Sequence, residues 1–270
     1  MAPVNIWIRL IAPTTTASLI CIGQPVRIKF ADGTLGGMLY LPPNANRMVI
    51  FVHTSSSACL KNRNYRLAQY LAARNFGILR VEMHTGREQV ENRFSGDDQY
   101  CPTLFAKRLL LSVQWLHQQR GLENFPVGFL GFGPGGTVVL MAAAALAATI
   151  DAVVSVDGLP DLVADRLAYI RAATLLVVSK GSNLQWCLNE IGYARLRCEK
   201  RLAAVSDARN SPSATGSDRI GNLAEDWLQH HLFPQKTVAR SQRFSELKNS
   251  TFNDGEKTTK GFRYANDRIH

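Results

Sequence analysis

The chain has 270 residues, a formal net charge of +10 and a hydrophobic content of 46%. One α/β domain of about 200 to 250 residues fits this length with segments to spare, and the hydrophobic content is that of a globular protein. No apolar run reaches the roughly 18 residues that a membrane span needs. The nearest run, residues 6–22, contains Arg9 and Pro13 and lacks the layout of a signal peptide.

Five scattered cysteines without a CxxC motif argue against a disulfide framework and against a zinc site, and they favour a reducing, cytoplasmic compartment. We therefore expect no metal and no cofactor. The positive charge is dispersed and accompanies no recognised nucleic-acid-binding module, so we expect no nucleic-acid partner. Acidic proteins and anionic surfaces are the partners that this charge favours, which leaves open a place at a membrane surface or in a large complex.

The first half of the chain predicts a hairpin and then alternating strands and helices. Residues 26–30 and 35–41 flank the turn dipeptide Asp32-Gly33, the pattern of a β-hairpin. Apolar runs predict buried strands at residues 48–53 and 77–81. Helical spacing of apolar residues predicts helices at 65–74 and 104–119, and the polar segment 84–100 is expected to be a loop.

The second half repeats this alternation. The predicted strands are residues 126–131, 152–156, 174–179 and 201–205, and the predicted helices are 135–148 and 223–232, with a loop at 207–221. Strands that alternate with helices imply a mostly parallel sheet covered on both faces. We expect an α/β fold with about eight strands and an antiparallel N-terminal hairpin.

Two segments lie outside this predicted domain of residues 26–233. The first is an N-terminal arm of residues 1–25, and the second is a basic, polar C-terminal tail of residues 234–270. The tail is too poor in aliphatic residues to form a core by itself. Aromatic residues recur through it and are candidate anchors on another surface: Phe244, Phe252, Phe262 and Tyr264.

Five short motifs occur in the order and spacing of a known family. They are HTSSS at 53–57, NRN at 62–64, VGFLGFGPGG at 127–136, PDL at 160–162 and LAEDWL at 223–228. From about residue 26 to 233 the chain resembles the dienelactone-hydrolase-like branch of the α/β-hydrolases. The resemblance implies the α/β-hydrolase fold and places the nucleophile elbow in the run VGFLGFGPGG.

Glycine stands where this resemblance implies the catalytic nucleophile. The elbow pattern G-x-S-x-G lifts a serine above the sheet on a strained strand-to-helix turn. Gly131 and Gly135 keep the flanking glycines, but the central position is Gly133, which has no hydroxyl to form an acyl-enzyme. The next residue, whose N–H forms half of the oxyanion hole in this fold, is Pro134, which has no N–H.

The other two triad positions are also substituted. The resemblance places the acid at Ser182 and the histidine at Asn210, and neither side chain can orient or replace a catalytic imidazole. No histidine occurs between His117 and His230, and His230 and His231 lie in the closing helix, too late for the family's loop. We predict that no triad assembles.

Other residues at the cleft where the resemblance places the active site, called here the old cleft, could still have a function. His53, Thr54, Gly133, Pro134 and Asp157 are expected at the ends of strands, where this kind of fold binds ligands. A relocated pair of His53 or His84 with one of the serines at 55–57 is one alternative. Another is a metal bound by Glu82, His84 and Glu88, although their spacing matches no known ligand pattern.

These observations predict a catalytically inactive α/β-hydrolase-like subunit that binds protein partners through its arm and tail. Two other interpretations stay open. One is a pseudoenzyme that binds a small molecule in the old cleft, and the other is an esterase of the dienelactone hydrolase type with atypical catalytic residues. Both rest on likeness of fold, which by itself does not assign a function.

Overall fold

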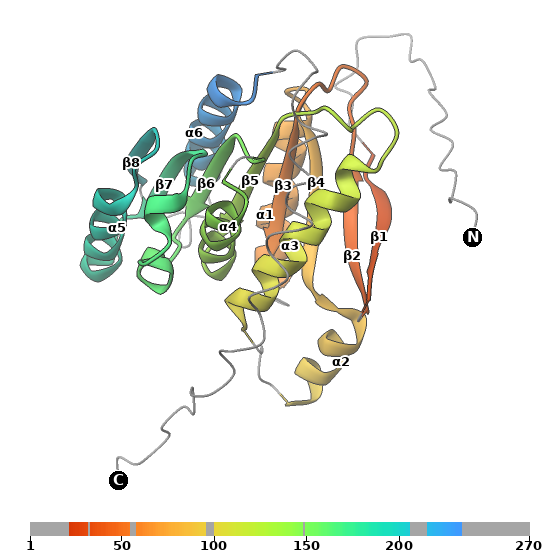
Figure 1. Ribbon diagram of the computed structural model, residues 1–270, viewed down its shortest axis with the longest axis horizontal. Coiled ribbons are helices and arrows are strands. Elements are labelled where there is room, and N and C mark those ends of the chain that lie inside the picture. Colours follow the sequence, from red (N-terminus) through yellow and green to blue (C-terminus); the bar gives the residue numbers. More distant parts are fainter. Residues whose placement is uncertain are drawn as a thin grey trace.

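A single eight-stranded sheet organises the computed structural model, which describes residues 22–31, 33–54, 58–95, 100–147, 149–205 and 215–233 (Figure 1). The strand order is β1-β2-β4-β3-β5-β6-β7-β8. In chain order the strands are β1 (Gln24–Phe30), β2 (Gly33–Tyr40), β3 (Met48–His53), β4 (Gly77–Thr85), β5 (Val127–Phe132), β6 (Ala152–Val156), β7 (Ala173–Ser179) and β8 (Lys200–Val205).

The pairing of the strands confirms the predicted fold class. β1 and β2 form an antiparallel hairpin, and β2 also runs antiparallel to β4. All the other pairs are parallel. Every residue of β3, β5, β6 and β7 is buried, which explains their continuous apolar sequences, because helices cover both faces of a parallel sheet.

Two groups of helices cover the two faces, and Figure 1 shows α3 and α4 in front of the sheet with α1 and α6 behind it. The helices are α1 (Ala58–Ala72), α2 (Gly86–Ser95), α3 (Pro102–His117), α4 (Pro134–Ala145), α5 (Asn183–Arg195) and α6 (Thr215–His231). Side chains of α3 and α4 join one hydrophobic cluster, and those of α1 and α6 join the other.

The segment predicted as a loop at residues 84–100 was assigned wrongly in its first part. β4 extends to Thr85, and α2 follows it. The helix starts at a capping box, in which the Glu88 N–H donates to Thr85 Oγ1 at 3.3 Å and the Thr85 N–H donates to Glu88 Oε2 at 2.8 Å. Contacts of Glu88 with distant residues hold this mostly polar helix in place. A buried apolar face is therefore not needed, and the sequence shows little helical periodicity of apolar residues.

Helix α5 was not predicted, and α6 begins earlier than predicted, at Thr215, inside the segment that we expected to be a loop. Only Asn189 and Gly192 of α5 are buried, so the helix has no apolar stripe to reveal it. Instead, α5 packs closely against the segment that contains Pro160: a Cβ on Gly192 would lie 2.6 Å from Pro160. Among the described helices, none is long and apolar enough to cross a membrane.

Candidate functional site

A sharp turn joins β5 to α4 at the centre of the sheet. Gly133 sits in this turn with φ 52° and ψ −121°, a conformation that glycine adopts readily and other residues do not. Its N–H donates to the Val156 carbonyl at 2.7 Å, and its own carbonyl accepts from the Gly136 N–H at 2.9 Å. The turn is therefore tied to the neighbouring strand β6 and to the first turn of α4, which gives the strand-turn-helix geometry that the elbow motif requires.

Two glycines of the motif are required by close packing of the backbone. A Cβ on Gly131 would lie 2.2 Å from the Gly135 carbonyl oxygen, and a Cβ on Gly136 would lie 3.0 Å from the Cα of Gly158. A Cβ on Gly133, in contrast, would meet no atom within 4 Å. Space for a side chain therefore exists at position 133 among the described residues, and the sequence leaves it unfilled.

Pro134 begins helix α4 and closes one side of the turn. Proline suits the first helical position because its fixed φ matches the helix and its missing N–H would have no partner inside the helix. Its carbonyl accepts a hydrogen bond from the Tyr100 hydroxyl at 3.0 Å. Burial raises the pKa of Tyr100 to about 12, so this hydroxyl stays protonated and remains a donor at neutral pH.

The end of β3, which carries His53 and is followed by Thr54, lies beside the elbow. A Cβ on Gly135 would lie 3.2 Å from the Val52 carbonyl and 3.9 Å from the Thr54 methyl group. His53 is buried, and its Nδ1 lies 2.9 Å from the side-chain nitrogen of Asn64. An amide nitrogen only donates, so Nδ1 is the accepting nitrogen of this ring.

Asp157 follows β6 on the other side of the elbow, and its carboxylate faces β7. One carboxylate oxygen accepts the Ser179 N–H and the other accepts the Ser179 hydroxyl, both at 2.7 Å. The Asp157 carbonyl accepts from the Gln185 side chain at 2.8 Å. Its φ of 51° is rare for a residue with a side chain. These contacts make Asp157 a brace between β6, β7 and α5.

Ser182 caps a helix in this structure. It precedes α5, and its hydroxyl accepts the N–H of Gln185 at 3.2 Å, which is the usual bond of an N-cap serine. Asn210 and the serines at 55–57 lie outside the described residues. The predicted triad positions that the structure places are therefore Gly133 and Ser182.

The sequence predicted a loop that begins at His84, and this was wrong. His84 belongs to β4 and is buried, with its ring edge-on to Phe105 at a centroid distance of 4.9 Å. Phe105 in turn contacts the ring of Tyr100 at 5.9 Å. This aromatic contact could not be predicted from the local sequence, because Phe105 belongs to α3 and lies about twenty residues further along the chain.

The carboxylates near His84 have other partners. Glu82 accepts from the Gln89 side chain at 2.8 Å. Glu88 makes a two-pronged ion pair with Arg108, with both nitrogen-to-oxygen distances at 2.7 Å. This guanidinium is the main reason why the pKa of Glu88 falls to about 2. The metal site considered for Glu82, His84 and Glu88 is not among the clusters of ligating side chains formed by the described residues.

An open recess of about 500 Å³ lies over the hairpin side of the sheet. Gly36 and Gly37 form part of its lining together with the charged residues Arg27, Arg80 and Glu82. It faces β1, β2 and β4, and β3 separates these strands from β5 and the elbow. The recess is therefore a different place from the cleft that the resemblance predicted.

No established protein-family model matches the chain. Two curated relatives from Mycobacterium tuberculosis strains, named "Putative phosphoribosyl transferase MT0597" and "Putative phosphoribosyl transferase Rv0571c", are each 32% identical over 210 residues. The match covers 77% of this chain and 46% of each relative, so the chain spans about half the length of the curated relatives it matches.

Solved structures give a fuller match. A dienelactone hydrolase from Anabaena variabilis is 28% identical with a TM-score of 0.73, over 78% of this chain and 99% of that protein. The Pyrococcus furiosus esterase Pf2001 has a TM-score of 0.64 at 13% identity, over 83% of this chain and 98% of that protein. Est1E from Butyrivibrio proteoclasticus has a TM-score of 0.60 at 11% identity, over 76% and 99%.

The last two likenesses, at low identity, concern the fold alone. The first adds a sequence likeness along nearly the whole length of a dienelactone hydrolase. Together with the sheet order and the strand-turn-helix at Gly133, it confirms the resemblance that the sequence motifs indicated. The chain therefore has the α/β-hydrolase fold, and over 78% of its length it is similar to a dienelactone hydrolase.

Proposed function

We propose that this chain is a non-hydrolytic α/β-hydrolase domain that serves as an interaction subunit of a larger assembly. One observation carries the proposal: the elbow between β5 and α4 has Gly133 at its centre and Pro134 after it. The turn keeps the backbone conformation of a nucleophile elbow, and the group that would attack an ester is missing from it.

The two residues remove two separate contributions to acyl transfer. Without a hydroxyl at position 133, no acyl-enzyme forms there. Without an N–H at position 134, half of the usual oxyanion hole is lost, and one such donor is typically worth about 3 kcal/mol of transition-state stabilisation. A water molecule attacking directly would therefore also meet a weakened site.

The contacts of His53, His84 and Asp157 support the same proposal. Nδ1 of His53 faces Asn64 at 2.9 Å, and a neutral amide cannot stabilise an imidazolium as a carboxylate does. His84 is buried against Phe105. Asp157, the carboxylate next to the elbow, accepts two hydrogen bonds from Ser179.

A turnover measurement tests the loss of chemistry. Purified full-length protein should hydrolyse short-chain aryl esters no faster than its own heat-denatured control. His53→Ala and His84→Ala serve as matched variants: His53 ends the strand beside the elbow, and His84 is the buried histidine of β4. Turnover above the control that disappears in either variant would refute the proposal and assign the activity to the substituted histidine.

Two features support the interaction role. The 210 matched residues make up 46% of the two Mycobacterium tuberculosis relatives, so in those proteins the matched region is joined to further chain. In this chain residues 1–21 precede the described domain and residues 234–270 follow it, and the net charge is +10. We infer a partner with an acidic surface, which such a charge attracts.

Truncation separates the interaction from the fold. Deleting residues 234–270, or residues 1–21 ahead of β1, should abolish co-purification with the partner in the native host. The near-ultraviolet circular dichroism of the purified variants should stay unchanged, which shows that the sheet still folds. Undiminished association after both deletions, with folded proteins, would contradict the proposed role of these segments.

Binding of a small molecule at the elbow is a second candidate function. It is favoured by the open space around position 133, where a Cβ would meet no described atom within 4 Å. A ligand seated there should raise the melting temperature of the wild type and have no effect on Gly133→Leu, whose side chain would fill the space. An equal shift in both proteins would place the ligand elsewhere.

A further inference from the structure

Three side chains with metal-binding atoms meet at the C-terminal end of α6. They are Glu199, which precedes β8, and the last two residues of the helix, His230 and His231. One ligating atom from each lies within 4.8 Å of the other two. Among the residues that the structure describes, no other group of three such side chains comes this close.

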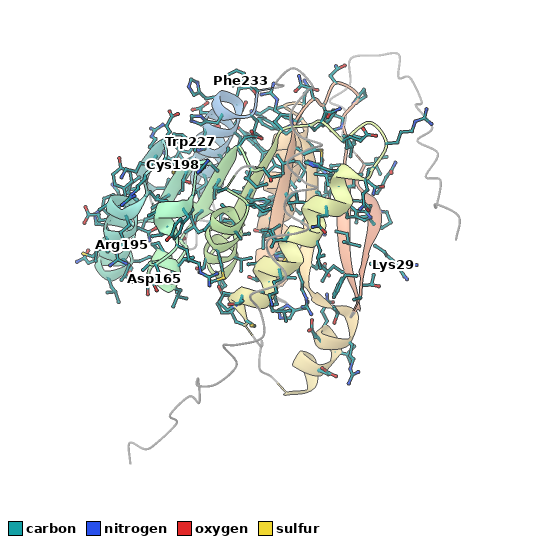
Figure 2. The ribbon with its side chains drawn as sticks, viewed as in Figure 1. Lys29, Asp165, Arg195, Cys198, Trp227 and Phe233 are labelled. Carbon is teal, nitrogen blue, oxygen red and sulfur yellow. The ribbon has the colours of Figure 1, made fainter. Side chains whose placement is uncertain are left out.

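His231 is held in place by its surroundings. Its ring lies 4.3 Å from the ring of Trp227, and only 10% of its side chain is exposed. Trp227 in turn donates from its indole nitrogen to the Ala173 carbonyl at 3.1 Å. Figure 2 places Trp227 and Phe233 along the end of α6, on the flank of the domain that also carries Cys198. The orientation of the His231 imidazole is thus fixed before any ligand binds.

Glu199 is held by its backbone. Its carbonyl accepts the Thr174 N–H at 2.8 Å, which anchors the residue to β7. Its carboxylate is mostly exposed, and Oε2 lies 3.7 Å from Nδ1 of His231. His230 is exposed, and its ring lies 4.8 Å from that of His231. One ligand is therefore held by packing, and the two others are exposed side chains on a fixed backbone.

The distances suit a tetrahedral ion after small rotations of these two side chains. Bonds of 2.0 to 2.2 Å at tetrahedral angles place neighbouring ligand atoms about 3.3 Å apart. The pair formed by Glu199 and His231 is already close to that separation at 3.7 Å. The end of a helix also attracts cations, because its last carbonyls carry a partial negative charge.

The chemistry of the three ligands selects among cations. Two imidazoles and one carboxylate suit zinc and similar divalent transition metals. Calcium and magnesium prefer sites made of oxygen atoms. Three protein ligands leave a fourth position of a tetrahedral ion open to water or to a side chain of another molecule.

We propose that Glu199, His230 and His231 form a zinc-binding site that ties the end of α6 to the segment before β8. The proposal is independent of the elbow and of the proposed loss of hydrolase chemistry. A zinc ion there would lock the closing helix against the sheet just before residue 234, where the predicted tail begins. The open position would face outward, because two of the three ligands are exposed.

Cobalt reports on such a site directly, because Co²⁺ in tetrahedral coordination absorbs strongly in the visible range. Untagged full-length protein is stripped with a chelator and titrated with Co²⁺, and Zn²⁺ is then added to displace it. We expect one equivalent to bind, the absorption to vanish with Zn²⁺, and the melting temperature to rise in Zn²⁺. His230→Gln and Glu199→Gln should each weaken binding at least tenfold.

Two controls keep the outcome decisive. Glu190→Gln removes an exposed carboxylate of α5, and His117→Gln removes a histidine outside the cluster; both should bind Co²⁺ like the wild type. The exposed His230 is substituted in preference to His231, because loss of the ring packed on Trp227 could disturb folding. Absence of the cobalt spectrum in wild type, or an equal affinity in His230→Gln and Glu199→Gln, would overturn the proposal.

Discussion

Replacing Gly131 by alanine should destabilise the protein much more than replacing Gly133, although both glycines frame the same turn. A Cβ at position 131 would lie 2.2 Å from the Gly135 carbonyl oxygen and 2.8 Å from the Gly136 nitrogen, where ordinary contacts are 3.4 to 4 Å. The atoms in the way belong to the backbone of α4, so the helix itself would have to move. We expect a loss of about 3 kcal/mol, the upper end of the usual cost of overpacking.

The cost at position 133 has a different origin. A Cβ there meets no described atom within 4 Å, so only the backbone conformation, with φ at 52°, opposes the substitution. Such conformations cost about 1 to 3 kcal/mol for a residue with a side chain. Alanine also restricts the unfolded chain more than glycine does, which stabilises the folded protein by about 0.4 to 1 kcal/mol. The net loss for Gly133→Ala should therefore be about 1 kcal/mol.

Urea unfolding followed by tryptophan fluorescence measures both losses in one experiment. The midpoints for Gly131→Ala, Gly133→Ala and the wild type are compared, and equal slopes confirm that the unfolded states are alike. Gly133→Ala should fall between the wild type and Gly131→Ala. Equal losses for the two variants, or a larger loss for Gly133→Ala, would refute the described geometry of the turn.

Three further predictions concern an ion pair, a helix cap and a brace between strands elsewhere in the domain. Arg108 lowers the pKa of Glu88 in the folded protein to about 2, below its ordinary value of 4.5. The stability that this pair contributes is therefore present above pH 4.5 and is lost as the pH falls towards 2. Glu88→Gln should flatten that part of an acid denaturation curve, and an unchanged curve would count against the pair. Ser182→Ala should cost about 1 kcal/mol in thermal unfolding through loss of the helix cap, while Ser182→Asp should retain most of it; a neutral alanine variant would contradict the capping role. Asp157→Ala removes the acceptor of two hydrogen bonds from Ser179 and should cost about 2 kcal/mol in urea unfolding, whereas no loss would show that the brace contributes nothing.

The strands of the central sheet could be predicted from the sequence because their environment is uniform. β3, β5, β6 and β7 are buried along their whole length, so their residues form unbroken apolar runs bounded by turns. The elbow could be predicted for a similar reason. Its flanking glycines are dictated by close backbone contacts, and such contacts leave a recognisable motif.

Other features depend on contacts between segments far apart in the chain. Helix α2 is polar along its length, and the contact of Glu88 with Arg108 on α3 spans 20 residues of sequence. His84 is buried because Phe105 comes over it from α3. The role of Ser182 as a cap was hidden because α5, which it begins, has no apolar periodicity. The local sequence around these residues therefore does not predict helix α2, the burial of His84 or the capping role of Ser182.

Labelling with a serine-directed fluorophosphonate probe tests the central claim, that the elbow at Gly133 has lost its chemistry. Full-length protein is incubated with the probe beside an active serine esterase, and labelled peptides are mapped by mass spectrometry. We expect no labelled residue in the native protein, while the esterase control reacts fully. A label that is lost on heat denaturation would show that the native protein has an active nucleophile. Its position would identify that residue, with Ser55, Ser56 and Ser57 the first candidates.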